Sequence, residues 1–380
     1  MFRKFMLVGL LVTLGLVLIG GGAIAQDDTV TFGIVCELSG SGANHGAQWR
    51  NGILLAFDEI NNAGGILGRQ IEYFTVDTES RPPVSVAAMQ YAVTRSPFAV
   101  FGTIYSSSTI ANMQILEEAG IIQFVGSTAT TIYEQGNYNI FATSPINRNV
   151  FPWLVRWMAS DLGVSKLVMV YTNDEMGSDG RDIMSEAAER YGVEFEGIAI
   201  QTGQADFAGE IARIQGMGVD TIFLYGHEEE NARFMIQLRT LGIDLKVVGY
   251  SPLLSSLALS LGGEAMEGVM GAATWSYAYP PIKDFADKYQ LLYGEVPSHD
   301  AMKGYVAVYT LKTAIEQVGS FDEELVRTWL HENTITTDME PRVFLDTSYR
   351  EDGTVDRDFF LVKIENGEQV IVQVISTKEE

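Results

Sequence analysis

The chain has 380 residues, of which 47% are hydrophobic, with 25 Lys and Arg against 49 Asp and Glu. Such a length predicts two domains of ~100 to 200 residues each, and the hydrophobic content excludes a disordered chain. The formal net charge of −24 argues against nucleic acid as a partner, because phosphate contacts need clustered Lys and Arg. The single cysteine, Cys36, excludes an intramolecular disulfide and a thiolate zinc site, and its role stays open.

The N-terminal segment 1–25 has the composition of a secretory signal. Arg3 and Lys4 precede an apolar run over 6–19, and a cleavage site with small residues ends at Ala25. Because the run is shorter than the ~20 residues that span a bilayer, a cleaved signal is favoured over a membrane anchor. We therefore expect an exported, extracytoplasmic or periplasmic chain, whose net charge falls from −24 to −26 once these two basic residues are removed.

Short apolar runs alternate with amphipathic stretches along the rest of the chain. Strands are expected at 29–35, 71–76, 98–101, 121–125, 166–171, 195–200, 221–225, 245–248 and 269–272. Apolar residues at three- and four-residue spacing predict helices at 49–60, 84–94, 110–119, 150–160, 181–191, 207–217 and 229–241. This alternation predicts an α/β fold in which parallel sheets are flanked by helices, with one series before about residue 146 and one after it.

The C-terminal part departs from this alternation. Helices are expected at 282–293, 301–318 and 322–331, and strands at 342–345, 359–364 and 370–375. Asn366 and Gly367 predict the turn of a hairpin between the last two strands. Because no flexible linker separates the two series, we expect strands that cross between interleaved lobes, where a few residues could act as a hinge.

Two loops rich in Ser and Thr, 102–109 and 126–131, follow neighbouring predicted strands. Ligands of parallel α/β sheets bind beyond the carboxyl ends of the strands, and a helix start there offers free N–H groups to an anion. Helix capping explains any single hydroxyl group. Two such loops in neighbouring βα units nevertheless favour a site for a small carboxylate or another polar head group.

Enzyme motifs are weak in this chain. Residues 39–46 with Asp77 resemble a dinucleotide fingerprint only loosely, because the glycine spacing differs. No G-x-S-x-G motif is present, and the spacing of the four histidines is not typical of a metal site. The glutamates at 228–230 open a predicted helix, and their favourable interaction with the helix dipole explains them without a catalytic role. We expect no catalytic residue, cofactor or metal.

A longer series of short motifs follows one order over the chain: Leu38-Ser39-Gly40, Gly46, Ala56, Ile60-Asn61, Gly64-Gly65-Ile66, Gly68-Arg69, Asp77, Gly102, Ser106-Ser107-Ser108, Gly120-Ile121, Gly177, Gly180, Asp206-Phe207 and Glu267-Gly268. This series resembles the periplasmic binding proteins of the branched-chain amino acid and amide uptake family. The resemblance covers essentially the whole mature chain. It implies a two-lobed type I periplasmic binding fold with three crossings between the lobes.

The resemblance also implies an organisation and a function. Lobe 1 would comprise 26–146 plus 277–334, and lobe 2 would comprise 147–276 plus 335–380. The expected protein is a monomer that clamps a small polar ligand, an amino acid, amide or small carboxylate, between its lobes and delivers it to the membrane permease of an ABC importer. Two alternatives stay open: a ligand-sensing receptor domain, which would use the same clamp, and a secreted enzyme.

Carried over position by position, the family's ligand site falls on residues of both lobes. These are His45, Trp49, Tyr105, Ser106, Ser127, Thr128, Ala129, Met176, His227, Glu228 and Ser251. The hydroxyl group after the third strand falls on Ser106. Ala129 stands where the family has a second hydroxyl group, so Thr128 or Thr130 would replace it. Met176 and Trp275 are candidates for soft or apolar walls.

Ser251 stands where the family has the acid that holds an α-ammonium group. Burying an ammonium group without a carboxylate would cost roughly several kcal/mol. Either Glu228 or Glu229 supplies the counter-charge, or the ligand is not an α-amino acid. We expect the second, which points to a small carboxylate or amide.

Overall fold

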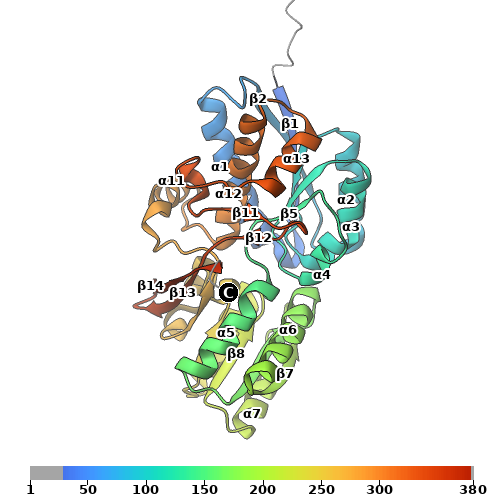
Figure 1. Cartoon of the computed structure of the whole chain (residues 1–380). Coiled ribbons are helices and arrows are strands. Elements are labelled where there is room, and N and C mark those ends of the chain that lie inside the picture. The colour runs from blue at the N-terminus through green and yellow to red at the C-terminus, as the bar shows by residue number, and fades with distance from the viewer. Residues whose placement is uncertain (1–28, 378–380) are drawn as a thin grey trace, which may run out of the picture.

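The computed structural model describes residues 29–377, so the predicted signal segment lies outside the described residues. The described chain folds into two α/β lobes, one above the other in Figure 1. Among residues 29–377, no helix combines the length and the apolar character that crossing a membrane requires.

The first lobe contains a five-stranded parallel sheet in the order β2-β1-β3-β4-β5. Its strands are β1 (Thr29–Cys36), β2 (Gln70–Asp77), β3 (Ala99–Phe101), β4 (Ile122–Val125) and β5 (Ile140–Ala142). Its helices are α1 (Ala43–Asn62), α2 (Pro82–Thr94), α3 (Ser106–Glu118), α4 (Thr130–Tyr133), α11 (Lys283–Tyr293), α12 (His299–Val318) and α13 (Glu323–Glu332). The strands β3, β4 and β5 are buried throughout, as expected for a parallel sheet covered on both faces.

The helices α1 and α12 are far apart in sequence and lie side by side in the first lobe (Figure 1). Glycines allow their backbones to approach. A Cβ atom on Gly52 would lie 2.0 Å from the carbonyl oxygen of Ala301, and one on Gly304 would lie 2.5 Å from that of Trp49. This close packing fixes the first turn of α12, which carries His299 and Asp300, relative to α1.

We predict that Gly52→Ala destabilises the protein, because the new methyl group must displace the backbone of α12. Overpacking of this kind costs about 1 to 3 kcal/mol in the free energy of unfolding. Chemical denaturation monitored by circular dichroism measures this loss. Gly209→Ala is the matched control, because Gly209 lies in a helix with nothing near its virtual Cβ. A stability of Gly52→Ala equal to that of the control would contradict the packing argument.

The second lobe contains a seven-stranded sheet in the order β14-β13-β10-β9-β8-β6-β7. Its strands are β6 (Lys166–Thr172), β7 (Glu194–Ile200), β8 (Thr221–Tyr225), β9 (Lys246–Gly249), β10 (Met270–Ala273), β13 (Phe359–Glu365) and β14 (Glu368–Ile375). Its helices are α5 (Asn147–Asp161), α6 (Glu175–Tyr191), α7 (Ala208–Gly216), α8 (Glu228–Thr240), α9 (Ser251–Leu254) and α10 (Ser256–Gly262). The strands from β7 to β10 are parallel, and β13 and β14 add antiparallel to β10.

Side chains of β6 alternate between the two faces of this sheet. Leu167 and Met169 belong to the hydrophobic cluster that includes α5 and α6, whereas Val168 and Val170 belong to the one that includes α7 and α8. Both faces are therefore covered by helices, as in the first lobe.

The chain passes between the lobes after β5, after β10 and before β13 (Figure 1). Arg357 on the third passage connects all three. Its buried guanidinium donates to the carbonyl oxygen of Thr143 on the first passage at 2.9 Å. It also lies 4.5 Å from the ring of Trp275 on the second passage, and its Nε donates to Thr347 Oγ1 at 3.0 Å. Burial lowers the pKa of Arg357 to about 10.

We predict that Arg357→Met destabilises the protein by about 2 to 4 kcal/mol, because it removes hydrogen bonds of a buried charged group and leaves acceptors unpaired. Thermal and urea unfolding measure the loss. The exposed Arg350, which pairs with Asp356 at 3.2 Å, provides the control Arg350→Met, which should change stability little. Equal stability of the two variants would contradict a central role of Arg357.

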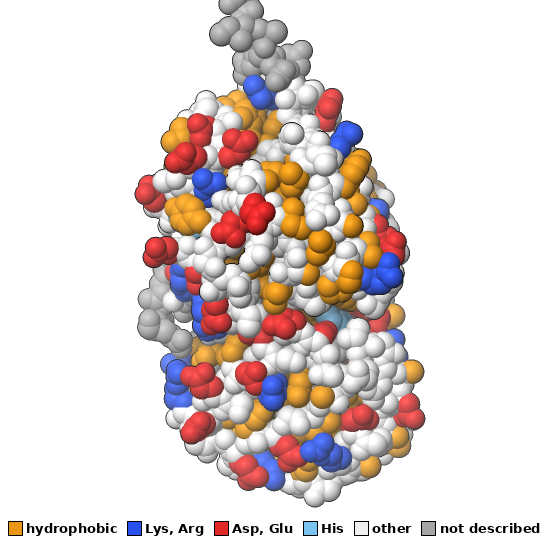
Figure 2. Space-filling model, turned by 90° about the vertical axis from the view of Figure 1, so that its right-hand side faces the viewer, with side chains coloured by type: hydrophobic (Ala, Val, Ile, Leu, Met, Phe, Trp, Pro, Cys, Tyr) orange, Lys and Arg blue, Asp and Glu red, His pale blue; other side chains and the backbone are white. Residues whose placement is uncertain are grey.

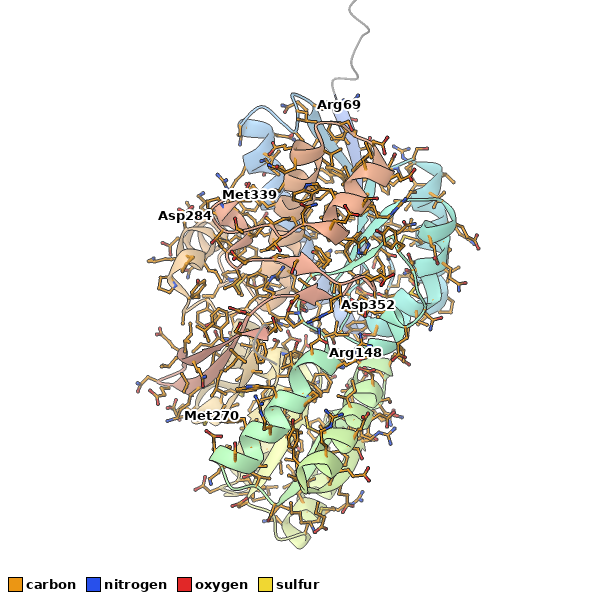
Figure 3. All side chains as sticks on the ribbon, in the orientation of Figure 1. Arg69, Arg148, Met270, Asp284, Met339 and Asp352 are labelled. Carbon is orange, nitrogen blue, oxygen red and sulfur yellow. The ribbon has the colours of Figure 1, made fainter. Side chains whose placement is uncertain are left out.

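One part of the chain departs from the expected division into lobes. Residues 335–356, which the sequence assigns to the second lobe, lie against the first. Within this segment, β11 (Ser348–Tyr349) and β12 (Val355–Asp356) form a two-stranded sheet. Strand β11 contacts α13 of the first lobe. The carbonyl oxygen of Gly353 accepts from the N–H of Ala142 in β5 at 2.9 Å. Arg148 at the start of α5 also pairs with Asp352 at 2.8 Å (Figure 3). The exact lobe boundaries stay a prediction.

The strands expected in the two βα series are present, with ends that differ by at most one residue. Sequence analysis missed the three-residue β5 and expected a strand at 342–345. The prediction of that strand was wrong, because Pro341 opens a 3-10 helix at Pro341–Val343 instead. The predicted hairpin turn is confirmed, because Asn366 and Gly367 have φ values of 55° and 76° between β13 and β14.

Candidate functional site

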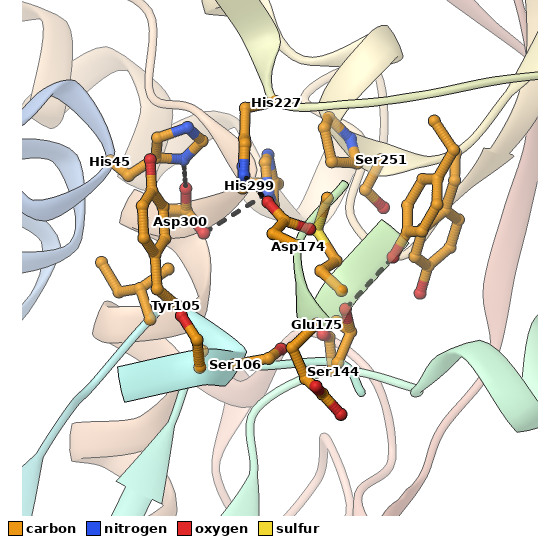
Figure 4. Close-up of a pocket in the computed structure, with 18 of the residues that line it drawn as sticks. His45, Tyr105, Ser106, Ser144, Asp174, Glu175, His227, Ser251, His299 and Asp300 are labelled. Carbon is orange, nitrogen blue, oxygen red and sulfur yellow. Dashed lines mark hydrogen bonds and ion pairs between the residues drawn. The ribbon is translucent and has the colours of Figure 1, made fainter. Parts of the chain in front are cut away.

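A cavity of about 240 Å³ lies between the lobes, beyond the carboxyl ends of the parallel strands (Figure 4). The first lobe contributes Ser41, His45, Ser80, Ile104, Tyr105, Ser106, Ser107, Gly126, Thr128, His299, Asp300 and Lys303 to its wall. The second lobe and the crossings contribute Ser144, Asp174, Glu175, Met176, Thr202, Tyr225, His227, Tyr250, Ser251, Pro252 and Thr274. In Figure 2 a histidine is visible at the waist between the lobes, and acidic side chains are scattered over both.

The start of α3 forms a polar part of the wall on the first lobe. Ser106 and Ser107 open the helix, and no side chain caps its N–H groups. Ser106 Oγ accepts weakly from the N–H of Ala129 at 3.4 Å, which joins α3 to the loop after β4. An uncapped helix start beside two serine hydroxyl groups is suited to a carboxylate.

Seven of the residues expected at the site line the cavity. They are His45, Tyr105, Ser106, Thr128, Met176, His227 and Ser251. The structure thus brings together residues from both lobes that are far apart in the sequence.

The other four expected residues do not line the cavity. Trp49 is fully buried on α1, where it belongs to the hydrophobic core. Ser127 Oγ is held by Thr109 Oγ1 at 2.6 Å and the carbonyl oxygen of Ile104 at 2.9 Å. Ala129 packs in the core, and Glu228 lies behind the wall, against His45. Trp275, expected as a possible wall, is also a core residue.

Ser251 is neutral, as the sequence shows, but acids reach the cavity from other positions. Its hydroxyl group accepts from the N–H of Thr274 at 2.9 Å. Asp174, Glu175 and Asp300 line the cavity instead. Glu175 Oε1 accepts from Thr131 Oγ1 at 2.8 Å. The family resemblance implies one acid, at the position of Ser251. In this chain the acidic groups of the cavity wall stand at other positions.

Asp174 and His227 form a pair on the second lobe. Asp174 caps α6 by accepting from the N–H of Gly177 at 2.9 Å, and its other oxygen contacts His227 Nε2 at 2.7 Å. Although burial alone would raise it, the pKa of Asp174 is lowered by His227. The ring of His227 stacks on Tyr105 of the first lobe, with 4.8 Å between the ring centroids.

His45 lies between two buried carboxylates, one from each lobe. Its Nδ1 is 2.8 Å from Asp300 Oδ2 on α12, and its Nε2 is 2.8 Å from Glu228 Oε2 on α8. Burial alone would lower the pKa of His45, but the two acids raise it well above its usual value. Burial lowers the pKa of the neighbouring His299 to about 4, so this ring is neutral at pH 7.

Several polar contacts hold the two lobes together around the cavity. Besides His45 and Glu228, Asn44 Nδ2 donates to Glu229 Oε1 at 2.6 Å. On the opposite side, the N–H of Thr130 donates to Asp179 Oδ1 at 3.0 Å. The structure is therefore a closed form of the cleft.

Glu37 supports the wall from behind. It follows β1, is fully buried, and accepts from the N–H groups of Ile104 at 3.1 Å and Tyr105 at 3.3 Å. Burial raises its pKa to about 7, although these hydrogen bonds and the charge of His45 oppose the shift. Glu37 thereby holds the loop that leads into α3.

The raised pKa of Glu37 predicts a pH dependence. An unfolded-state pKa of 4.5 against a folded value of about 7 means that folding favours the protonated form. This contribution to stability is fully present below pH 4.5 and is lost as the pH rises through 7, by about 3 kcal/mol in total.

Glu37→Gln should abolish that part of the pH dependence, because the amide keeps an acceptor oxygen but does not ionise. Urea unfolding of both proteins between roughly pH 4 and 9 measures the difference. Glu72→Gln, at an exposed position on β2, is the control. Parallel stability curves for Glu37→Gln and the unchanged protein would contradict the prediction.

Two α/β lobes joined by three passages around a polar cavity define a binding protein of the clamp type. The chain belongs to the periplasmic binding protein family, whose model matches residues 29–369.

Its relatives agree with this assignment. The leucine-, isoleucine-, valine-, threonine- and alanine-binding protein of Pseudomonas aeruginosa is 25% identical over 315 residues, which cover 82% of this chain and 84% of that protein. A branched-chain amino acid transporter substrate-binding protein of Streptococcus pneumoniae, solved with isoleucine, has a TM-score of 0.81 at 23% identity, covering 91% and 99% of the two chains. A solute-binding protein of an ABC transporter from Rhodopseudomonas palustris, solved with 3,4-dihydroxybenzoic acid, has a TM-score of 0.84 at 21% identity, covering 92% and 98%. The predicted family and type I fold are thus confirmed.

Sequence reasoning missed the acids Asp174, Glu175 and Asp300 and the base Lys303. Asp174 carried a usable signal, because it follows the predicted strand at 166–171 closely and is a residue type preferred at an N-cap, although the helix that it caps begins at Glu175 and not at the predicted residue 181. Asp300 and Lys303 carried none, because only the packing of α12 on α1 brings them to the cleft.

Proposed function

We propose that this protein is the solute-binding component of an ABC importer and captures a small polar solute outside the cytoplasm. The observation that carries the proposal is the cavity between the lobes, which is lined from both and closed by contacts across the cleft. A solute that touches both walls stabilises the closed form by its differential affinity for it, and no chemical step is needed. The closed, loaded protein would then deliver its solute to a membrane permease. A non-enzymatic, monomeric protein exported by its N-terminal segment is part of this proposal.

The proposed solute carries a carboxylate. The start of α3 with Ser106 and Ser107 is suited to that group, and the relatives named above bind amino acids or a benzoic acid derivative. The expectation of a ligand without an α-ammonium group rested on the neutral Ser251. Glu175 weakens that reason, because it lines the cavity and only its Oε1 has a hydrogen bond described here. We therefore favour an amino acid, with a small aromatic or aliphatic carboxylate as the second candidate.

Identification of the bound solute tests the proposal. The protein is purified without its signal segment and denatured, and the solutes it releases are identified by mass spectrometry. A thermal-shift screen of amino acids, amides and small carboxylates follows, since a tightly bound solute raises the melting temperature of the protein. Recovery of a chemically altered solute after incubation would replace the transport proposal with an enzymatic one, and the absence of any stabilising carboxylate would overturn the proposed solute class.

Ser106→Ala should weaken binding of the solute identified in this way. Loss of one buried hydrogen bond costs about 1 to 3 kcal/mol, which corresponds to a Kd about 5- to 150-fold higher. Isothermal titration calorimetry measures the change. Ser108→Ala serves as the control, because Ser108 is a buried residue of the same helix that does not line the cavity. An unchanged Kd for Ser106→Ala would remove Ser106 from the site.

A further inference from the structure

Two consecutive residues of α1 face two consecutive residues of α8 across the cleft. His45 Nε2 lies 2.8 Å from Glu228 Oε2 and 4.0 Å from Glu229 Oε2. One donor atom from each of these three residues lies within 4.8 Å of the other two. The histidine comes from the first lobe and both glutamates from the second, so the three donor atoms meet between the lobes.

The buried donor atoms of His45 and Glu228 face one another, and the other oxygen of Glu228 lies 3.4 Å from His299 Nδ1. Glu228 is 1% exposed, and neither of its carboxylate oxygens makes a hydrogen bond. His45 is 4% exposed, and its Nε2 contacts only these carboxylates, at 2.8 Å from Glu228 Oε2 and 4.0 Å from Glu229 Oε2. Buried polar atoms of this kind require an explanation, and a bound ion is one of the usual ones.

The opposite sides of the same groups are held in place. His45 Nδ1 is 2.8 Å from Asp300 Oδ2 (Figure 4), and Asn44 Nδ2 donates to Glu229 Oε1 at 2.6 Å. With one N–H at Nδ1 directed to Asp300, His45 offers Nε2 to a metal that displaces the second proton, which the raised pKa otherwise keeps on the ring. Hydrogen bonds from behind that fix the tautomer of a histidine and the orientation of a carboxylate are characteristic of metal sites.

The local charges also favour a cation. Lys303 Nζ lies 3.3 Å from Asp300 Oδ1 and balances that carboxylate. Two glutamates then remain opposite one imidazole. Glu228, His299 and Asp300 form an alternative group of possible ligands, but the ammonium group of Lys303 beside Asp300 would repel a cation there.

We propose that His45, Glu228 and Glu229 form a site for a divalent transition-metal ion such as zinc, held from both lobes at once. One imidazole nitrogen and two carboxylate oxygens are ligands that suit zinc, and a fourth position would remain for water or solute. His45 also lines the cavity, so the ion would lie at its wall. Because its ligands come from both lobes, the ion would favour the closed form. This site goes beyond the proposed function, which needs no metal.

Titration with zinc chloride tests the site. The protein is treated with a chelator, dialysed and titrated by calorimetry with no solute present. We expect one ion per chain and a raised melting temperature with zinc. Cobalt(II) should give the intense visible absorption of a four-coordinate ion, which an ion loosely held at the surface would not show.

Variants at the proposed ligands distinguish this site from adventitious binding. Glu229→Gln and His45→Gln should each raise the Kd for zinc by about tenfold or more. The first is the safer variant, because Glu229 is only partly buried, and the melting temperature without zinc checks the fold of both. His331→Gln and Glu332→Gln, adjacent residues of α13 remote from the cleft, are the matched controls.

Two results would overturn the metal site: no saturable binding of zinc, or a zinc affinity that both ligand variants leave unchanged. Either would leave His45 and Glu228 as an ion pair that joins the lobes. The zinc titration uses no solute, and the solute screen is repeated with protein treated with chelator, so failure of the metal site and failure of the proposed transport function are distinguishable.

Discussion

The guanidinium of Arg357 is the interaction on which the arrangement of the lobes depends. It lies where the three passages meet, and it touches Thr143 on the first and Trp275 on the second while belonging to the third. A buried cation is costly, and the carbonyl oxygen of Thr143, the hydroxyl group of Thr347 and the ring of Trp275 compensate it only where the three passages meet. The hinge of the clamp is therefore also a packed centre of its own.

The cleft also contains buried charged groups that depend on partners in the protein, and there both acidic and basic groups are present. His45 is placed between Asp300 and Glu228, His227 contacts Asp174, and Lys303 contacts Asp300. Each group gives up hydration that its partners in the protein replace. The pair His45–Glu228 exists in full only when the lobes meet, so opening the cleft exposes both groups to water and closing it desolvates them. The polarity of the cleft thus enters the equilibrium between open and closed forms even before a solute binds.

The fold was predictable from the sequence because its strands are apolar and its helices are amphipathic. Both patterns can be recognised within one short segment of the chain. Strand β6 reads as a continuous apolar run because both its faces are covered. The misassigned strand at 342–345 shows the limit of such local patterns, since Pro341 could open a 3-10 turn as readily as precede a strand. The site was predictable only in part. Ser106 and His227 follow strands and lie at the expected edge, whereas Asp300 reaches the cavity through the contact of α12 with α1, and no local pattern records that contact.

The order of the strands has a consequence for how such a protein can change over evolution. The second sheet takes five strands from 166–273 and two from 359–375, and α12, which packs on the first sheet's α1, lies between those stretches. No single continuous piece of chain holds a complete lobe. Exchange of one lobe between relatives would therefore need several simultaneous cuts, whereas single residues at the cleft can be replaced one at a time. New solute preferences in this architecture are thus more accessible by point substitution at the walls of the cavity than by recombination of whole lobes.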